Sequence, residues 1–575
     1  MRIVRITLCL TLLLLMTDRL FAQAGATGTI LGTVTDSSGA IIPNVKVTVT
    51  NTATNISFRT VTSSAGDYYA PSLNPGSYTV SAEGKGFQKT VTTSFTLAVD
   101  QKVRVDLALK LGAVTETLEV TAQAVTLDTD SADESTLLSQ QQVEQLPLNG
   151  RNFMQLLLVS AGAVTVGGEQ GTMRQGEGNA VSINGGRPEG NNYTLDGLIN
   201  TDQALVTPAV ILSQDAIQEF KVESGTYSAE YGFSASQINL ISKGGTNRLH
   251  GSIFEFNRNN AYDAKPFATA TDYQAATATT LPILRQNQFG FVADGPVYIP
   301  KLYDGRNRTF WMANYEGWRI NNGTNLYDST PNPATLTGDF SAETYQAPAG
   351  SGLPGGPLPA YGTADCATLL SLGHNCMPVD PTTGAAFPGN VIPSADITNR
   401  LANVAIQNGY FPAPTLGNTQ PEGVTNFIKS AGLPLTTNQQ TYRGDQNLGR
   451  LGSVFFRYTY SKYQNASYLN SQSLIYGLVN QFETQKNWEV SHTINVGSAN
   501  VNNFRFGHLD AQAPQGAPAP PDTAISALGE TGVFTKFAAL QASWPSLQLS
   551  QYSLFGGPIN SYTGSDNPSW EYADG

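Results

Sequence analysis

The stretch from Ala180 to Arg248 constrains the fold of this chain more than any other. It reads AVSINGGRPEGNNYTLDGLIN and, after a short gap, DAIQEFKVESGTYSAEYGFSASQINLISKGGTNR. Short alternating runs separated by Gly-Gly, Asp-Gly and Gly-Gly-Thr-Asn are typical of strands joined by tight turns. After Arg248 the chain becomes aromatic and strand-like to its end. A compact domain before a long series of membrane-type strands predicts a plug followed by its barrel.

The composition favours several β domains. A chain of 575 residues is too long for one hydrophobic core, and it combines 56 Gly and 31 Pro with only 13% charged residues. The predicted fold class is mostly β: a β-sandwich, a mixed α/β plug domain and the N-terminal part of a transmembrane antiparallel β-barrel. The predicted boundaries are a signal peptide over 1–24, the sandwich over 25–112, a linker over 113–135, the plug over 136–247 and the barrel over 248–575.

The first 24 residues have the pattern of an export signal. Arg2 and Arg5 precede the apolar run Ile6–Met16, and small residues follow around Ala22 and Ala24. The alternative is a membrane anchor, but a run of about eleven residues is too short to span a bilayer as a helix. The mature chain is therefore expected to be exported.

The charge balance argues against nucleic acid as a partner. The chain carries a net charge of −12, and removal of three arginines and one aspartate with the leader leaves 29 basic and 43 acidic residues, or about −14. An acidic chain without basic clusters lacks the electrostatic footprint that nucleic acid requires.

No catalytic, cofactor-binding or metal site is expected. None of the four histidines lies in an HxxE or HExxH setting, where a zinc ion would find its ligands; they are His250, His374, His492 and His508. The chain also shows no Gly-x-Ser-x-Gly elbow and no phosphate-cradling loop.

Cys366 and Cys376 are predicted to form a disulfide. Cys9 lies in the leader, so the mature chain has an even number of cysteines in an oxidising compartment. Closing a loop of about ten residues would stabilise the chain by roughly 2.5 to 3 kcal/mol, which stiffens a Pro- and Gly-rich surface segment. A metal site is the alternative, although His374 is the only nearby imidazole and three or four ligands are needed.

The segment after the leader predicts a small β-sandwich. Valine alternates with polar residues in Val45–Thr50, and about seven such runs occur before residue 112. The sequences GTVTDSSGAIIPNVKVTV at Gly32–Val49, GDY at Gly66–Tyr68 and PGSYTV at Pro75–Val80 resemble the carboxypeptidase regulatory-like domain. That resemblance implies a transthyretin-like, carbohydrate-binding-like sandwich and no particular ligand.

The linker holds a candidate coupling motif. The string ETLEVTA resembles the TonB box of outer-membrane receptors, an extended strip that adds as a strand to a periplasmic partner. Its residues are Glu116, Thr117, Leu118, Glu119, Val120, Thr121 and Ala122. Two plainer interpretations stay open, namely the last strand of the sandwich and a simple linker.

Three further motifs carry a family resemblance. LPLNGRNF at Leu146–Phe153, SINGGRPEGNNYTLDG at Ser182–Gly197 and DAIQEFKVESGTYSAEYG at Asp215–Gly232 resemble TonB-dependent outer-membrane receptors of the Oar-like kind. Those proteins join a carboxypeptidase regulatory-like domain to a plug and an outer-membrane barrel. The resemblance implies three partners: a TonB-type periplasmic energy-coupling protein, outer-membrane lipid, and an unknown solute such as a carbohydrate or peptide.

The plug segment also permits local predictions. Gln140–Gln145 favours a helix that Pro147 ends. An apolar helical patch should pack under the plug sheet and consists of Phe153, Leu156, Leu157 and Val159. Gly185-Gly186 and Asp196-Gly197 are expected to be two-residue hairpin turns with positive φ.

Four charged residues of the plug are candidates for a network inside the domain or against the barrel wall. They are Arg187, Asp196, Glu219 and Glu223. The alternative is that each is solvated or caps a turn.

From residue 248 onward the chain alternates as a barrel wall does. The strings IFEFN, FWMANYEGW and SVFFRYTYSK each place aromatic or apolar residues on one face, namely Phe254, Phe256, Trp311, Ala313, Tyr315, Val454, Phe456, Tyr458 and Tyr460. An apolar-out, polar-in wall with aromatic girdles is expected of a barrel in lipid. The predicted location is the cell outer membrane, with the sandwich in the periplasm.

The barrel segment is expected to be incomplete. About 330 residues with eight to ten strands cannot close the roughly 22-stranded, plugged barrel that the resemblance implies. We therefore expect a fragment or a truncated product. The long polar loops Asn321–Tyr361 and Pro393–Leu435 should face outward and hold any residues that recognise a solute.

Three functions remain open from the sequence. The first is an energy-coupled outer-membrane receptor that binds a bulky solute, such as an oligosaccharide, peptide or chelate, and passes it through a plugged barrel. The second is an adhesion or surface-export protein that uses the same barrel without solute uptake, in which case the linker strip is dispensable. An enzyme is the third and weakest interpretation.

Overall fold

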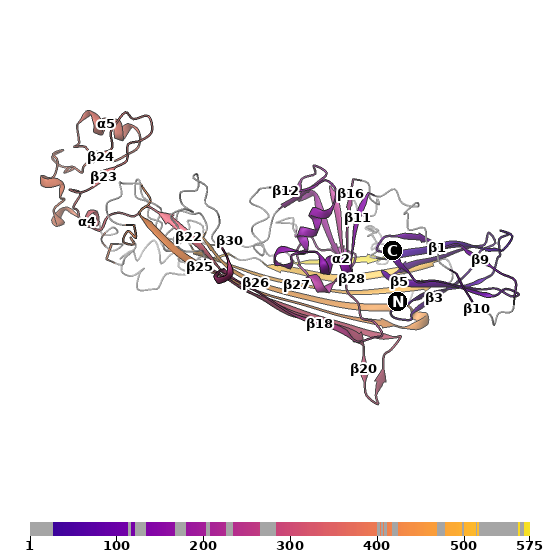
Figure 1. Cartoon of the computed structure of the whole chain (residues 1–575). Coiled ribbons are helices and arrows are strands. Elements are labelled where there is room, and N and C mark those ends of the chain that lie inside the picture. The colour runs from indigo at the N-terminus through magenta and orange to yellow at the C-terminus, as the bar shows by residue number, and fades with distance from the viewer. Residues whose placement is uncertain are drawn as a thin grey trace, which may run out of the picture.

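The computed structural model arranges the described chain as three β-rich units. It describes residues 27–112, 117–120, 134–166, 180–202, 208–225, 234–264, 283–398, 403, 406–407, 411–416, 424–468, 478–496, 500–512, 515–516, 562–563 and 568–574. Figure 1 shows the sandwich at one end of a long layer of strands and the plug lying on one side of that layer. The predicted signal peptide lies outside the described residues. No helix among the described residues is long and apolar enough to cross a membrane.

The N-terminal unit is the predicted sandwich. One sheet contains β1 (Gly28–Asp36), β4 (Asp67–Leu73), β8 (Lys102–Arg104) and β9 (Leu107–Leu109). The other contains β2 (Lys46–Asn51), β3 (Ser57–Val61), β5 (Gly76–Glu83), β6 (Lys89–Thr92), β7 (Phe95–Leu97) and β10 (Thr117–Val120). Inward valines such as Val47, Val49 and Val80 are fully buried between the sheets, as period-two alternation predicts. Gly32 is required where the chain between β8 and β9 passes β1 in the same sheet, because a Cβ there would lie 2.0 Å from the Val105 carbonyl oxygen.

The second unit is a plug built on a mixed sheet. Its strand order is β11 (Ser135–Ser139), β16 (Ile217–Ser224), β17 (Ser236–Ser242), β14 (Asn191–Leu195) and β15 (Leu198–Ile199), and β12 (Ala163–Val166) pairs separately with β13 (Ala180–Ile183). The helical elements are α2 (Gln140–Gln145) and the 3₁₀ helices η1 (Asn149–Arg151), η2 (Phe153–Val159), η4 (Pro188–Gly190) and η5 (Gln214–Ala216). The predicted helix and its bounds are thus confirmed.

The apolar patch of the plug is confirmed at three of its four positions. Phe153, Leu156 and Leu157 are fully buried, and the Phe153 ring lies 6.0 Å from that of Phe220 on β16. Val159, by contrast, is half exposed at the end of η2.

Only one of the two predicted hairpin turns exists. Asp196 and Gly197 have φ of 53° and 92° and join β14 to β15 directly. Gly185-Gly186 does not close a hairpin, because β13 pairs with β12 and not with β14. The positive-φ pair there is Asn184 and Gly185, which turns the chain into η4.

The third unit is one long antiparallel sheet. Its main path is β18 (His250–Asn259), β19 (Leu284–Pro296), β22 (Thr309–Asp328), β25 (Phe427–Asn447), β26 (Ser453–Tyr468), β27 (Leu478–Val496), β28 (Asn500–Gln512) and β31 (Ser569–Asp574), with β29 (Gln515–Gly516) and β30 (Tyr562–Thr563) beside it. Each strand pairs with its neighbour in sequence, the meander expected of an outer-membrane barrel. The described strands form an open wall whose edges are β18 and β31.

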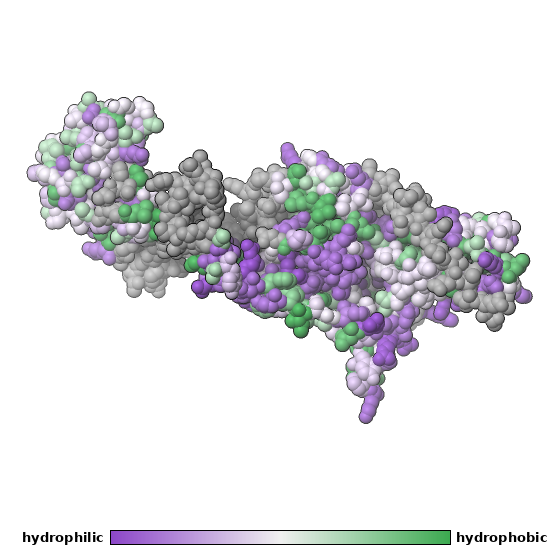
Figure 2. Space-filling model, in the orientation of Figure 1, coloured by the Kyte–Doolittle hydropathy of each residue, from purple (hydrophilic) through white to green (hydrophobic). Residues whose placement is uncertain are grey.

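The wall alternates as predicted in two of the three quoted strings. On β22, Asn314 and Glu316 face the plug and are buried, whereas Trp311 and Tyr315 face away. On β26, Phe456 faces away and is 47% exposed. In Figure 2, hydrophilic residues gather over the strands beneath the plug, and hydrophobic patches lie on the plug and along the outward edge of the wall.

β18 reverses the predicted orientation. The guanidinium carbon of Arg151, from the plug, lies 4.3 Å from the centroid of the Phe254 ring and 5.4 Å from that of Phe256. The two rings therefore face the plug, and Ile253 faces outward with 90% of its surface exposed. Cation–π contact with a plug arginine explains why these apolar side chains point inward.

The connection between β22 and β25 carries a small folded unit of its own. It contains α4 (Pro333–Leu336), β23 (Thr344–Tyr345), β24 (Gly356–Pro357), α5 (Ala364–Ser371) and the 3₁₀ helices η8 (Pro388–Asn390) and η9 (Ser394–Asp396). Tyr345, Leu358, Leu369 and Met377 form its core. The predicted disulfide between Cys366 and Cys376 is present and links the first turn of α5 to the chain that follows the helix. The predicted loop bounds were too wide, since Asn321–Asp328 and Phe427–Leu435 belong to strands.

Candidate functional site: the contact between plug and barrel

The tip of β14 presents a carboxylate to the barrel wall. The Asp196-Gly197 turn projects the Asp196 side chain beyond the sheet, where the backbone N–H and hydroxyl of Ser242 donate hydrogen bonds of 2.8 and 2.7 Å to it. Asp196 is 2% exposed. A buried carboxylate needs charged or hydrogen-bonded partners, and the wall supplies them.

Two arginines of the wall meet this carboxylate. Arg443 on β25 and Arg457 on β26 stand directly opposite each other in the ladder, where two like charges would repel. Asp196 lies between them, with Oδ2 at 2.7 Å from Nε of Arg457 and Oδ1 at 3.5 Å from Nη1 of Arg443. The plug carboxylate therefore balances a repulsion that the wall would otherwise contain.

The network extends further along the wall. The Arg457 Nη2 lies 2.7 Å from Oε2 of Glu489 on β27, and its Nη1 donates to Asn487. Arg443 donates to the Ser242 carbonyl of the plug at 3.0 Å and pairs with Asp445 at 2.9 Å. Arg457 and Glu489 are fully buried, so the charges are shielded from water.

The electrostatics of Asp196 reflect this pairing. Burial on its own would raise the pKa of Asp196, but the guanidinium groups of Arg457 and Arg443 and the hydrogen bonds from Ser242 hold that pKa below its ordinary value of 3.8. Asp196 is therefore ionised at neutral pH, and the plug and wall are joined by charges of opposite sign.

A second contact joins the LPLNGRNF motif to the wall. Arg151 pairs with Asp215 of the plug at 2.7 Å, and its Nε lies 3.7 Å from Oε1 of Glu316 on β22. Ser213 donates a hydrogen bond to the same glutamate. Trp318 of the wall lies beside Gly150 of the plug, because a Cβ at Gly150 would be 3.4 Å from the Trp318 ring. The Trp318 indole is therefore sensitive to contact between plug and wall.

A third contact joins the plug to the sandwich. The Val99 N–H of the sandwich donates a 2.8 Å hydrogen bond to Oε2 of Glu219 on β16. Lys221, on the same strand, lies 3.9 Å from Asp100 of the sandwich and 2.5 Å from Glu223. Burial, the largest influence, raises the pKa of Glu219 to about 7.

This contact should depend on pH. Because the pKa of Glu219 is raised from 4.5 to about 7, the docked form holds a proton that the unfolded chain releases. The contribution of Glu219 to the free energy of unfolding is then greatest below pH 4.5. It falls as pH rises to about 7, by at most about 1.4 kcal/mol per pH unit. We expect the melting temperature of the full chain to decrease from pH 5 to 7, and the Glu219→Gln variant to lose this part of the dependence. Glu144→Gln, at an exposed glutamate of α2, is the control; an unchanged profile in Glu219→Gln would contradict the assignment.

The predicted plug residues do not form one network. Asp196 meets the wall, and Glu219 and Glu223 lie beside Lys221 on β16 near the sandwich. Arg187 is exposed and lies before η4, at the opposite end of β14 from Asp196. Asp196 is separated from Glu219 and Glu223 because β17 lies between β16 and β14. Arg187 is separated from Asp196 by the length of β14. Sequence reasoning missed Arg151 of the plug and three residues of the wall, Arg443, Arg457 and Glu489. The signal for the three wall residues is a charge at an inward position of a wall strand.

The candidate TonB box is described only in part. Thr117–Val120 forms β10, which pairs in parallel with Lys89–Thr92 of β6 at the edge of the sandwich sheet. Glu116, Thr121 and Ala122 lie outside the described residues. The last-strand interpretation thus holds for four residues, and the coupling role stays a prediction.

Within the described residues, no group of three or more His, Cys, Asp or Glu side chains could hold a metal ion. The charged cluster of Asp196, Arg443, Arg457 and Glu489 is internally paired, so its chemistry is that of a contact between two parts of a protein.

Comparisons with known proteins match both ends of the chain. Residues 241–575 match the family described as outer membrane beta barrel domain, and residues 29–110 match the carboxypeptidase regulatory-like domain. The TonB-dependent transporter Oar of Myxococcus xanthus is 27% identical over 411 residues, which cover 68% of this chain. The chain spans only 36% of the length of that curated relative.

Solved structures of outer-membrane proteins also resemble the chain. The outer membrane transporter YddB from Escherichia coli is 9% identical with a TM-score of 0.45, covering 76% of this chain and 44% of its own. The siderophore receptor PirA from Acinetobacter baumannii is 12% identical with a TM-score of 0.30, covering 76% and 54%.

Proposed function

The chain belongs to the outer membrane β-barrel domain family, and from this premise we propose that it is the receptor and plug portion of a TonB-dependent transporter. In this proposal the wall lies in the outer membrane, the plug closes its lumen, and a bulky solute passes when the plug is displaced. The solute is an oligosaccharide, a peptide or a chelate. The transport cycle requires no catalytic chemistry from the chain.

The observation that carries the proposal is the buried ionic contact between Asp196 and the wall arginines. A plug held by one internally paired cluster has a defined closed state, and breaking such a cluster costs several kcal/mol. The outer membrane holds neither ATP nor an ion gradient, so the energy has to come from a partner anchored elsewhere.

The proposed handle for that partner is the strip Glu116–Ala122. Its described part, β10, is an edge strand of the sandwich sheet, and an edge strand presents unpaired backbone groups to which another strand can add. A periplasmic coupling protein that pairs with this strip would connect the linker, and through it the plug, to a pulling force.

Replacing residues 116–122 with a Gly/Ser segment of equal length should abolish solute uptake and leave solute binding intact. Uptake is measured with radiolabelled maltodextrins and oligopeptides in cells that express the full-length protein, with and without a protonophore. The control replaces residues 123–129 of the same linker in the same way and should leave uptake near the wild-type level. Unchanged uptake after loss of 116–122 would refute coupling through this strip and would favour the adhesion or export alternative.

A further inference from the structure

Residues 297–308 form an arm between β19 and β22. The short strands β20 (Tyr298–Ile299) and β21 (Tyr303–Asp304) pair, and the base is closed by hydrogen bonds from Val297 N–H to Thr309 and from Gly305 N–H to Val297. Pro300, Lys301 and Leu302 form the tip, where Lys301 has a φ of 64°. The arm is therefore a folded hairpin and not a loose loop.

The arm lies at the periplasmic end of the wall. Asn307, at its base, accepts a hydrogen bond from Asn55 of the sandwich and one from Asn247 at the end of the plug. The turn 448–452 at the same end is short, whereas at the opposite end β18 and β22 stop at Asn259 and Asp328 and their partners β19 and β25 begin only at Leu284 and Phe427. Outer-membrane barrels have short periplasmic turns and long extracellular loops.

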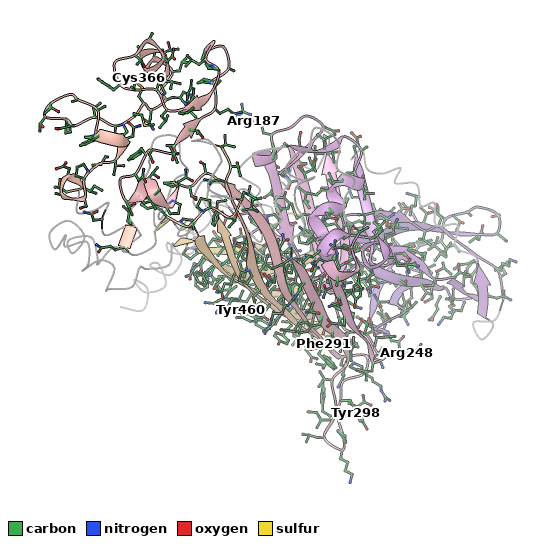
Figure 3. All side chains as sticks on the ribbon, turned by 60° about the vertical axis from the view of Figure 1, so that its left-hand side comes forward. Arg187, Arg248, Phe291, Tyr298, Cys366 and Tyr460 are labelled. Carbon is green, nitrogen blue, oxygen red and sulfur yellow. A yellow bond between two sulfur atoms is a disulfide. The ribbon has the colours of Figure 1, made fainter. Side chains whose placement is uncertain are left out.

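The arm projects away from the plug. Figure 1 and Figure 3 both show it leaving the wall on the face opposite the plug, with Tyr298 well clear of the strands. That face is the one on which Ile253 and Phe291 expose their side chains. The arm thus continues the outward apolar surface at its periplasmic edge.

The exposed side chains of the arm combine apolar and basic groups. Leu302 is 79% exposed and Tyr298 is 57% exposed, with the Arg306 guanidinium 5.7 Å from the Tyr298 ring centroid. The basic residues Lys301, Arg306 and Arg308 outnumber the single acid, Asp304. A local surplus of positive charge stands out in a chain whose net charge is −12.

We propose that this arm lies in the headgroup layer of the periplasmic leaflet and binds anionic phospholipid. Tyrosine rings and leucine partition to the membrane interface, and each lysine or arginine near an anionic surface adds attraction. A folded arm directed outward at the rim of a membrane wall has this layer beside it. The inference rests on the outer-membrane location of the family and is independent of whether the chain transports a solute.

The test uses a fluorescent label in the full chain reconstituted into vesicles. Leu302→Cys is labelled with an environment-sensitive dye in a Cys9→Ser background, since Cys366 and Cys376 are bonded to each other. The vesicles contain phosphatidylcholine and phosphatidylglycerol with a nitroxide on the lipid headgroup. The same label at Ile253 marks the lipid-facing wall and establishes insertion, and the label at Ser38, an exposed sandwich residue, marks the aqueous side.

In preparations where position 253 is quenched, position 302 should also be quenched and position 38 should not. The quenching at 302 should increase when phosphatidylglycerol replaces phosphatidylcholine. Reversing two charges with Lys301→Glu and Arg306→Glu should lower this preference by about fivefold or more for each charge. The matched reversal of Lys85 and Lys110, which are exposed on the sandwich, should leave it unchanged.

Two results would overturn the proposal. Equal, weak quenching at 302 and 38 would mean that the arm faces water. Strong quenching at 302 that is the same in both lipids, or that survives the charge reversal, would rule out recognition of anionic headgroups.

Discussion

The Arg457→Met variant is expected to loosen the plug from the wall and to lower the free energy of unfolding by about 3 to 5 kcal/mol. Methionine keeps much of the volume of the arginine but removes the guanidinium that lies 2.7 Å from Glu489, and it leaves Asp196 with the Ser242 hydrogen bonds and the more distant Arg443, 3.5 Å away. Both carboxylates would remain buried, and an uncompensated buried charge is the costly product of such a substitution.

Urea unfolding of the full chain in detergent micelles measures this effect. The fluorescence of Trp318, which is buried beside Gly150 of the plug, is read with the other four tryptophans replaced by phenylalanine. It should change at a lower urea concentration in the variant than in the matched protein that keeps Arg457. Arg450→Met, at an exposed arginine of the turn after β25, should change stability by less than about 0.5 kcal/mol. Neutralising the partners together in Asp196→Asn, Arg457→Met and Glu489→Gln should recover part of the loss, because no charge is then left unpaired.

Low pH should weaken the same contact by protonating Asp196. The pKa of Asp196 is held below 3.8, so its contribution is fully present above that pH and is lost as pH falls through the lower, folded value. Equal urea midpoints for the wild type and Arg457→Met at neutral pH would contradict the role assigned to Arg457.

The Leu157→Ala variant is expected to destabilise the plug by about 2 to 5 kcal/mol. Leu157 is fully buried in the plug core, and truncation removes buried apolar surface and leaves a cavity. Its neighbour Leu158 is 44% exposed, so Leu158→Ala should cost far less and serves as a control with the same chemistry. The same urea titration provides the measurement. Equal losses in the two variants would show that η2 does not pack as described.

Local features of the plug could be predicted because they depend on neighbours in sequence. The bounds of α2 follow from Pro147, and the Asp196-Gly197 turn follows from the tolerance of both residues for positive φ. The cysteine pairing was also predictable, since Cys366 and Cys376 are the two cysteines that remain after the predicted leader. The order of sandwich, plug and barrel was predictable from the resemblance to Oar-like receptors that LPLNGRNF and the neighbouring motifs carry.

The candidate site could be predicted only in part. Asp196 was identified, but Arg443 and Arg457 lie more than two hundred residues away and meet it only through the register of β25 against β26. Arg187 is, like Asp196, a charged residue at a predicted glycine turn of the plug, and yet its side chain is exposed. The inward rings of Phe254 and Phe256 depend on Arg151 of another unit, which period-two alternation cannot reveal.

The crossing from plug to wall has a mechanical consequence. At Gly245 the chain passes so close to β22 that a Cβ would lie 2.6 Å from the Trp311 carbonyl oxygen, so the plug is tied there by its own backbone. The Asp196 cluster holds it to β25 and β26 beside this crossing, since a Cβ at Gly244 would lie 3.6 Å from Asp445 and 3.8 Å from Arg443. The backbone crossing and the ionic cluster therefore hold the same edge of the plug, so loss of the ionic contacts would free the plug from β25 and β26 while its backbone stays attached beside β22.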